Sequence, residues 1–193
     1  MPLGRIVRLQ VQTRPLKSGQ KPSRIYETAA LMEVVELALS PNGAVGFTAS
    51  GEAFVDVHNT AHPATRNEGH NPVSFGLTSH YSRMRDRFGP TMIDGCAGEN
   101  ILVETSRPLR MEDLGSRLAL QSAENGELVE LTQVAVALPC VEFSRFALRR
   151  PHATAEELKP VLQFLDEGTR GFYVTPAREG FTVRVGGVLV TLD

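Results

Sequence analysis

The chain has 193 residues and a mass of 21.1 kDa, which suits one domain able to bury about 70% of its unfolded surface. Hydrophobic residues make up 41% and charged residues 22%, so the chain is expected to fold. Twenty Lys and Arg residues against 22 Asp and Glu give a formal charge of -2, which argues against nucleic acid or an acidic membrane as a partner.

The sequence predicts a cytoplasmic protein without a membrane partner. No run approaches the roughly 18 apolar residues of a membrane span, and the first ten residues lack the apolar segment of a signal peptide. The two cysteines are too few for a disulfide framework, which favours a reducing compartment.

Short strands dominate the predicted secondary structure. Val7, Leu9 and Val11 alternate with polar residues, which predicts a strand with one wet face. The stretch 29–39 fits either a buried strand or a short helix. Further strands are expected at 100–104, 117–121, 128–136 and 171–175. The alternating runs 181–185 and 188–192 flank Gly186-Gly187, a link typical of a hairpin because primed turns need positive φ.

Two segments are predicted to be helices. In 78–88 an apolar stripe recurs at helical spacing, and Gly89-Pro90 would end the helix. Arg83 and Arg87 share the opposite face, where solvation is the simplest expectation and an anion site is the alternative. In the second segment Thr154 and Glu157 form a capping box before an apolar run, although Pro160 lies inside it.

Four of the five histidines lie between residues 58 and 80. His58 and His62 would share one face of a helix and could bind zinc there. Asn59, Thr60 and Pro63 favour a loop instead, so a functional polar loop and a purely structural one both stay open.

The two cysteines have different prospects. Cys140 follows a long apolar stretch and Pro139, which places its thiol at a sheet edge or loop mouth; a buried packing role is the alternative. Arginines downstream of it would favour the nucleophilic or metal-binding thiolate. Cys96 lies in a loop with two glycines and is expected to be a packing residue.

Read in order, these pieces resemble a MOSC domain, the module named after the C-terminal part of molybdenum-cofactor sulfurases. The resemblance covers residues from about 4 to 192 and is carried by four stretches and the predicted terminal hairpin. The stretches are Val55-Asp56-Val57-His58, the run 98–104 beginning Gly-Glu-Asn, the stretch 131–140 ending in Pro139-Cys140, and 170–173. It implies one MOSC-like domain over 1–193, mainly β (α+β), with a twisted, partly closed β-barrel and a few peripheral helices.

The resemblance also implies a site and a chemistry. Cys140 would be the ligand of molybdenum in a molybdenum cofactor (molybdopterin), or would carry sulfur as a persulfide. Asp56 and His58 would line the mouth, with His58 as a proton donor. Arg66 and Arg170 would hold the phosphate of the pterin. The adjacent pair Glu99 and Asn100 would brace their loop or accept hydrogen bonds from the pterin.

The implied activity is reduction of N-oxygenated small molecules, with electrons from a separate electron-donor protein. The alternatives are a non-redox sulfur carrier served by a cysteine desulfurase, and a barrel that has lost its cofactor. The chain departs from the family at Val55 and Asn59, where Gly and a second His are common, and at the turns Gly115-Ser116 and Gly186-Gly187. No lysine has a Schiff-base context, so pyridoxal phosphate is not expected.

Overall fold

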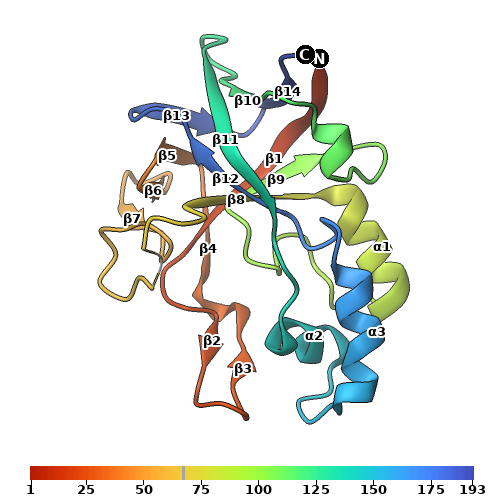
Figure 1. Cartoon of the computed structure of the whole chain (residues 1–193). Coiled ribbons are helices and arrows are strands. Elements are labelled where there is room, and N and C mark those ends of the chain that lie inside the picture. Colours follow the sequence, from red (N-terminus) through yellow and green to blue (C-terminus); the bar gives the residue numbers. More distant parts are fainter. Residues whose placement is uncertain (67) are drawn as a thin grey trace.

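The computed structural model describes residues 1–66 and 68–193 and is built around a closed β-barrel (Figure 1). Within these residues seven strands follow one another around the barrel in the order β14-β10-β11-β12-β8-β9-β1. Pairing of β1 with β14, for example Arg5 with Val188, closes it fully, so the partly closed barrel of the prediction is closed here. All barrel pairs are antiparallel except β8 with β9. The strands are β1 (Pro2–Gln12), β8 (Val73–Leu77), β9 (Ile101–Glu104), β10 (Leu118–Gln121), β11 (Leu128–Val136), β12 (Phe172–Pro176) and β14 (Val188–Thr191).

The remaining strands lie outside the closed ring. The ambiguous stretch 29–39 forms two of them: β4 (Leu31–Val34) pairs with β1, and β5 (Glu36–Ser40) belongs to a second sheet in the order β13-β5-β6-β7. The other members of that sheet are β13 (Phe181–Arg184), β6 (Gly43–Phe47) and β7 (Ala53–Val55). A short hairpin, β2 (Lys17–Ser18) with β3 (Ile25–Tyr26), projects from the barrel next to the helices (Figure 1).

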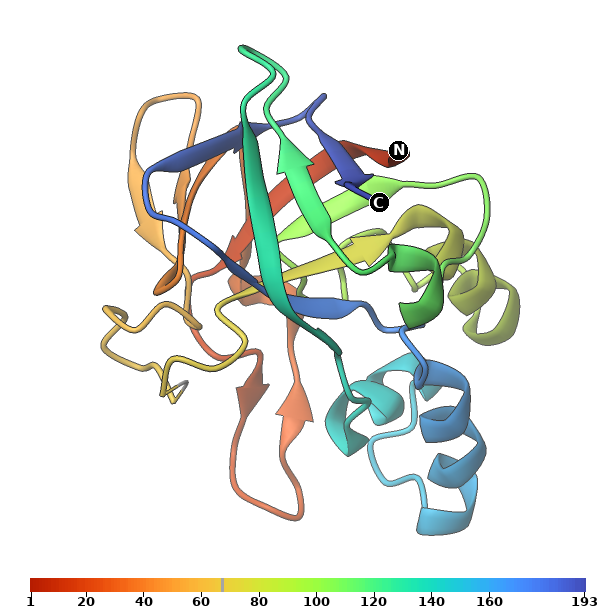
Figure 2. The same cartoon turned by 45° about the horizontal axis from the view of Figure 1, so that its top comes forward.

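In the part of the chain that the structure describes, three α-helices pack on one side and end of the barrel, away from the chain termini (Figure 2). The predicted helices α1 (Thr78–Phe88) and α3 (Ala155–Leu165) are confirmed, with Gly89 as the C-cap of α1 and a complete Thr154–Glu157 capping box on α3. A third helix, α2 (Val141–Leu148), has no counterpart in the prediction. Two short 3-10 turns, η1 (Thr28–Ala30) and η2 (Met111–Leu114), complete the elements.

Apolar packing in the described residues forms two cores, and strand β9 contributes side chains to both. The barrel interior is filled by side chains from all seven ring strands, including Phe75 and Phe172, whose stacked ring centroids lie 5.1 Å apart. The second core joins α1, α2 and α3 to the hairpin and contains Tyr26, Tyr81 and Phe143. Leu16, Tyr26 and Ala97 of this second core also line the pocket described below.

Two strand predictions need correction. In β1 the pairing register with β9 shifts between Ile6 and Arg8, a bulge at Val7. The bulge turns Val7 outward (37% exposed) while Ile6 and Leu9 are fully buried, so the simple alternation is wrong there. The Gly186-Gly187 link does form a turn, but β13 pairs with β5 and β14 with β10 and β1. It is therefore a corner between two sheets and not a hairpin.

The arginine face of α1 is also more than a solvated surface. Arg83 and Arg87 both lie over the Phe164 ring of α3, with guanidinium carbons 5.4 and 4.5 Å from its centroid. Arg87 also donates to the backbone oxygen of Pro160 at 3.1 Å. These contacts join α1 to α3, since an arginine stacks on an aromatic ring as well as pairing with acids.

Candidate functional site

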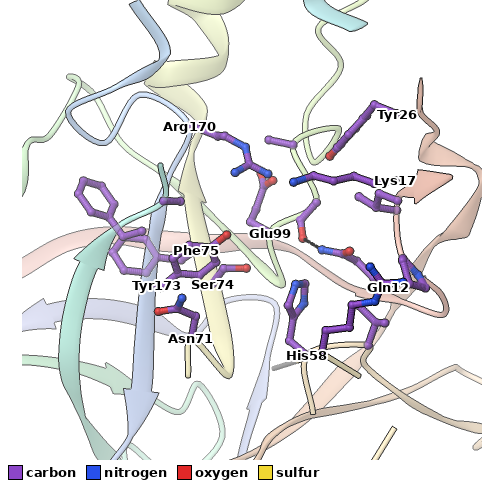
Figure 3. Close-up of a pocket in the computed structure, with 18 of the residues that line it drawn as sticks. Gln12, Lys17, Tyr26, His58, Asn71, Ser74, Phe75, Glu99, Arg170 and Tyr173 are labelled. Atoms are coloured by element: carbon purple, nitrogen blue, oxygen red, sulfur yellow. Dashed lines mark hydrogen bonds between the residues drawn. The ribbon is translucent and has the colours of Figure 1, made fainter. Parts of the chain in front are cut away.

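One pocket of about 420 Å³ gathers most of the predicted site residues, a volume in the range of small-molecule sites (Figure 3). Its walls come from the β2–β3 hairpin, the loop after β7, the loop before β9, and strands β8 and β12. The ionisable side chains that line it, tyrosines aside, are Lys17, Arg24, His58, Arg66, Glu99 and Arg170. Four cationic groups against one carboxyl suit a ligand that carries negative charge.

The loop before β9 is fixed from below by the polar face of β1. Gln10 donates from Nε2 to the backbone oxygens of Gly95 and Glu99 at 2.7 and 2.8 Å. Gln12 donates likewise to Gly98 at 2.6 Å. Both glutamines are buried, so the face of β1 predicted to be wet is covered by this loop. These bonds hold Glu99 at the pocket.

Asp56 lies beneath the pocket and positions the residues around it. Its side chain is fully buried, and Oδ2 accepts from the backbone N–H of Gln12 at 2.7 Å and from Asn100 Nδ2 at 2.9 Å. Oδ1 accepts the backbone N–H of His58 at 2.8 Å and lies 3.0 Å from Nδ1 of its ring. Asp56 is not among the lining residues, so its place is behind His58 and not at the mouth.

Asn100 joins the same network on its other side. Its Oδ1 accepts from the backbone N–H and the hydroxyl of Ser74 at 3.0 and 3.2 Å, while its backbone N–H donates to the Ser74 oxygen at 3.0 Å. The side chain is 1% exposed. Asn100 therefore braces the loop and β8, one of its two predicted roles.

Glu99 is a buried acid at the pocket. Tyr81 donates its hydroxyl to Oε2 at 2.9 Å, and Oε1 has no hydrogen-bond partner in the described part of the chain. Burial is the main cause that raises the pKa of Glu99 to about 7, against the lowering effects of hydrogen bonds and of Arg170. A Cβ at Gly76 would lie 2.7 Å from Oε1, so only glycine leaves room for this carboxyl.

Arg170 connects the pocket to the predicted cysteine. It is half-buried, donates from Nη1 to the backbone oxygen of Leu138 at 3.0 Å and lies 5.4 Å over the Phe143 ring. Burial acts to lower its pKa, but the nearby Tyr173, Cys140 and Tyr26 raise it further, so Arg170 stays charged. The guanidinium therefore contacts residues on both sides of Cys140 in the chain.

Cys140 itself is half-buried and is the N-cap residue of α2, with a side chain that caps nothing. It packs beside the second core and is not among the residues that line the pocket. The strand before it ends at Val136, as Pro139 predicts, but a helix start replaces the expected sheet edge. Cys96, by contrast, is 1% exposed, and burial followed by the nearby Glu99 raises its pKa to about 12. The packing role predicted for Cys96 is confirmed.

The zinc reading of the histidine loop has no support among residues 1–66 and 68–193. Residues 57–64 form turns and not a helix. His62 has its Nε2 3.2 Å from the Thr13 oxygen, and its Nδ1 accepts the backbone N–H of Ala64 at 3.0 Å. No group of three or more His, Cys, Asp or Glu in these ranges could hold a metal ion.

The hairpin wall of the pocket was not predicted. Lys17, Arg24 and Tyr26 reach the pocket from it, and Arg24 pairs with Glu142 of α2 at 2.6 Å. Lys17 lies 4.0 Å from the same carboxylate. The pairing holds the hairpin against the helix that begins at Cys140. No local sequence pattern predicts that the hairpin forms a pocket wall, because Arg24 pairs with Glu142, a residue more than a hundred positions away.

Comparison with known proteins identifies the fold only. The sequence matches no family model and no curated protein. Among solved structures the chain is similar to the YuaD protein of Bacillus subtilis (TM-score 0.55, 11% identity, 97% of this chain and 92% of that one). It is also similar to YiiM from Geobacillus stearothermophilus (0.54, 18%, 98% and 75%) and from Escherichia coli (0.51, 14%, 84% and 65%). YiiM is a MOSC-domain protein, so the predicted MOSC-like barrel is confirmed. No helix in the described ranges is long and apolar enough to cross a membrane.

Proposed function

We propose that this chain binds molybdenum cofactor with Cys140 as the protein ligand of the metal and reduces N-oxygenated small molecules. The observation that carries the proposal is the position of Arg170, which lines the pocket while its guanidinium binds the Leu138 oxygen two residues before Cys140 and lies over the Phe143 ring three residues after it. A soft sulfur ligand beside a cationic pocket is the donor set that a thiophilic metal with an anionic organic ligand requires. The MOSC-like fold supports the same reading.

The residues at the pocket fit such a group. Lys17, Arg24 and Arg66 are the cations on the hairpin and on the loop after β7, and they would take the phosphate by charge-assisted hydrogen bonds. Glu99, Phe75 and Phe172 also belong to the lining, and all three are buried. When bound, the cofactor would supply the two-electron chemistry that the side chains lack.

His58 would donate protons in the reduction. Cleavage of an N–O bond consumes two electrons, from a separate electron-donor protein, and two protons, and releases water. Oδ1 of Asp56 faces His58 Nδ1 at 3.0 Å, which fixes the ring at the pocket wall. A histidine ring held in place by a buried carboxylate can pass a proton to a ligand in the pocket.

The test is to express the full chain in a host that makes the cofactor, with Cys140→Ala as the test variant and Cys96→Ala as the matched control. Molybdenum is measured by elemental analysis, and pterin by fluorescence after oxidation. We expect both in the wild type and in Cys96→Ala, and neither in Cys140→Ala. Wild-type protein without molybdenum would overturn the proposal.

The same half-buried thiol supports the second candidate, a sulfur carrier. The Cys140 thiolate would attack the outer sulfur of a desulfurase persulfide, form its own persulfide and release the desulfurase thiolate. This reading predicts cyanide-labile sulfur on the wild type, none on Cys140→Ser, and no reductase turnover. Molybdenum-free protein with labile sulfur would favour it over the first candidate.

A further inference from the structure

Two buried polar atoms of the pocket lack a hydrogen-bond partner. In residues 1–66 and 68–193 four buried side-chain atoms are in this state, and two of them, Glu99 Oε1 and Arg170 Nε, belong to side chains that line the same pocket. A buried acceptor or donor left unpaired costs about 1–3 kcal/mol. Such atoms in a pocket indicate bonds that a ligand completes.

Both side chains are held in place by their other contacts. The Tyr81 hydroxyl donates to Glu99 Oε2 and accepts the backbone N–H of Ala97 at 2.9 Å, which fixes the carboxyl plane. Arg170 is fixed by its bond to the Leu138 oxygen. Figure 3 shows the Glu99 carboxyl pointing toward the Arg170 guanidinium, and the two interact electrostatically. The pocket thus offers a fixed acceptor beside a fixed donor.

We propose that Glu99 and Arg170 form one subsite for a planar ligand edge that carries an N–H donor next to an acceptor atom. Lactams, ureides and aminopyrimidinones carry such an edge. The N–H would donate to Glu99 Oε1, and the neighbouring acceptor would take a hydrogen bond from the Arg170 guanidinium. Arg170 then recognises a heterocycle edge and not the phosphate suggested by the resemblance.

The neighbouring lining suits a flat ring. Half-buried Tyr173 lines the pocket from β12, and it is backed by Phe75 and Phe172, whose rings are buried and stacked on each other inside the barrel. Aromatic side chains bind planar ligands through their faces and edges. A ring without the N–H donor would leave the buried Glu99 Oε1 without a hydrogen bond. The free-energy cost of that unpaired atom discriminates strongly against such a ligand.

The inference rests on the proposed function only for the question of which molecule carries the edge, the cofactor or a substrate. The pterin of the cofactor carries an aminopyrimidinone edge, and a substrate with a lactam or ureide edge is the other source. The binding chemistry is the same in both cases. Cofactor-free protein therefore tests the subsite, and cofactor-loaded protein distinguishes the sources.

The experiment titrates cofactor-free full-length protein with pterin (2-amino-4-oxopteridine) and with 1,3-dimethyllumazine, a flat pteridine that has no N–H donor. Binding is followed by fluorescence for the wild type, Glu99→Leu, Glu99→Gln and the exposed control Glu104→Gln. We expect the wild type and the control to prefer pterin by at least tenfold, the scale of one hydrogen bond to a charged or buried partner. The preference should vanish in Glu99→Leu and be reduced in Glu99→Gln.

Comparing two ligands on each variant separates recognition from damage to the fold, because a misfolded variant loses both. No saturable pterin binding by the wild type, or equal preference in wild type and Glu99→Leu, would overturn the subsite. Loss of pterin binding on loading with cofactor would assign the edge to the cofactor, and retained binding would assign it to a substrate. Protein that never takes up molybdenum but shows the preference would refute the proposed function and leave the subsite standing.

Discussion

Replacing Glu99 with Gln should stabilise the protein at alkaline pH and leave it nearly unchanged at acid pH. Glu99 is 4% exposed, and burial raises its pKa to about 7 from the ordinary 4.5. A carboxyl with a raised pKa favours the fold in its neutral form. Its contribution is complete below about pH 4.5 and is lost as the pH rises through about 7. The gap in pKa corresponds to about 3 kcal/mol.

The measurement is urea unfolding of wild type, Glu99→Gln and Glu104→Gln at pH 5 and pH 8. Glutamine keeps an oxygen that can accept the Tyr81 hydroxyl but never ionises, so any packing cost is the same at both pH values. The free energy of unfolding of Glu99→Gln relative to wild type should therefore rise by about 2.5 kcal/mol between pH 5 and pH 8, because part of the effect is already present at pH 5. A relative stability that does not change with pH would refute the reasoning.

Three further predictions concern the supports of the fold and the pocket. His80 is 2% exposed, and burial lowers its pKa to about 4, so stability that is present above pH 6.5 is lost as the pH falls toward 4. Phenylalanine at this position does not titrate. In urea unfolding, the loss of stability between pH 7 and pH 4 should therefore be about 3 kcal/mol smaller for His80→Phe than for the wild type. Glu142→Gln, which weakens the Arg24 pair, should cost about 2 kcal/mol and speed hydrogen exchange in 17–26 but not in the barrel; uniform exchange would contradict it. Gly171 has φ +119°, and a Cβ there would lie 2.6 Å from the Phe75 oxygen, so Gly171→Ala should lower the melting temperature and weaken ligand binding next to Arg170. An unchanged melting curve would show that the backbone can relax there.

Local signals predicted the elements whose causes are local. The Thr154–Glu157 box begins α3 and Gly89 ends α1 where the sequence placed these boundaries, and residues 128–136 form β11 as expected. Helix α2 was not predicted, because its eight residues are too few to show a clear helical periodicity of apolar side chains. The bulge at Val7 was not predicted, because a bulge is a shift in pairing with a partner strand, here β9, which the sequence of β1 alone does not reveal.

The candidate site divides in the same way. Motif order placed His58, Arg66, Glu99 and Arg170 at one pocket, where the structure brings them together. Burial and partners could not be predicted from motifs. The assignment of Asp56 to the mouth is an example, because its burial depends on four bonds to residues at positions 12, 58 and 100.

The pairing of β1 with β14 leaves residues 1 and 193 side by side at the end of the barrel farthest from α2 (Figure 1). A short linker could therefore join them, and new ends could be opened in an exposed turn without breaking the strand order. A circularly permuted chain of this kind should keep its pocket. If the new ends lie in the turn of the β2–β3 hairpin, a fluorescent protein can be fused beside the pocket wall that this hairpin forms.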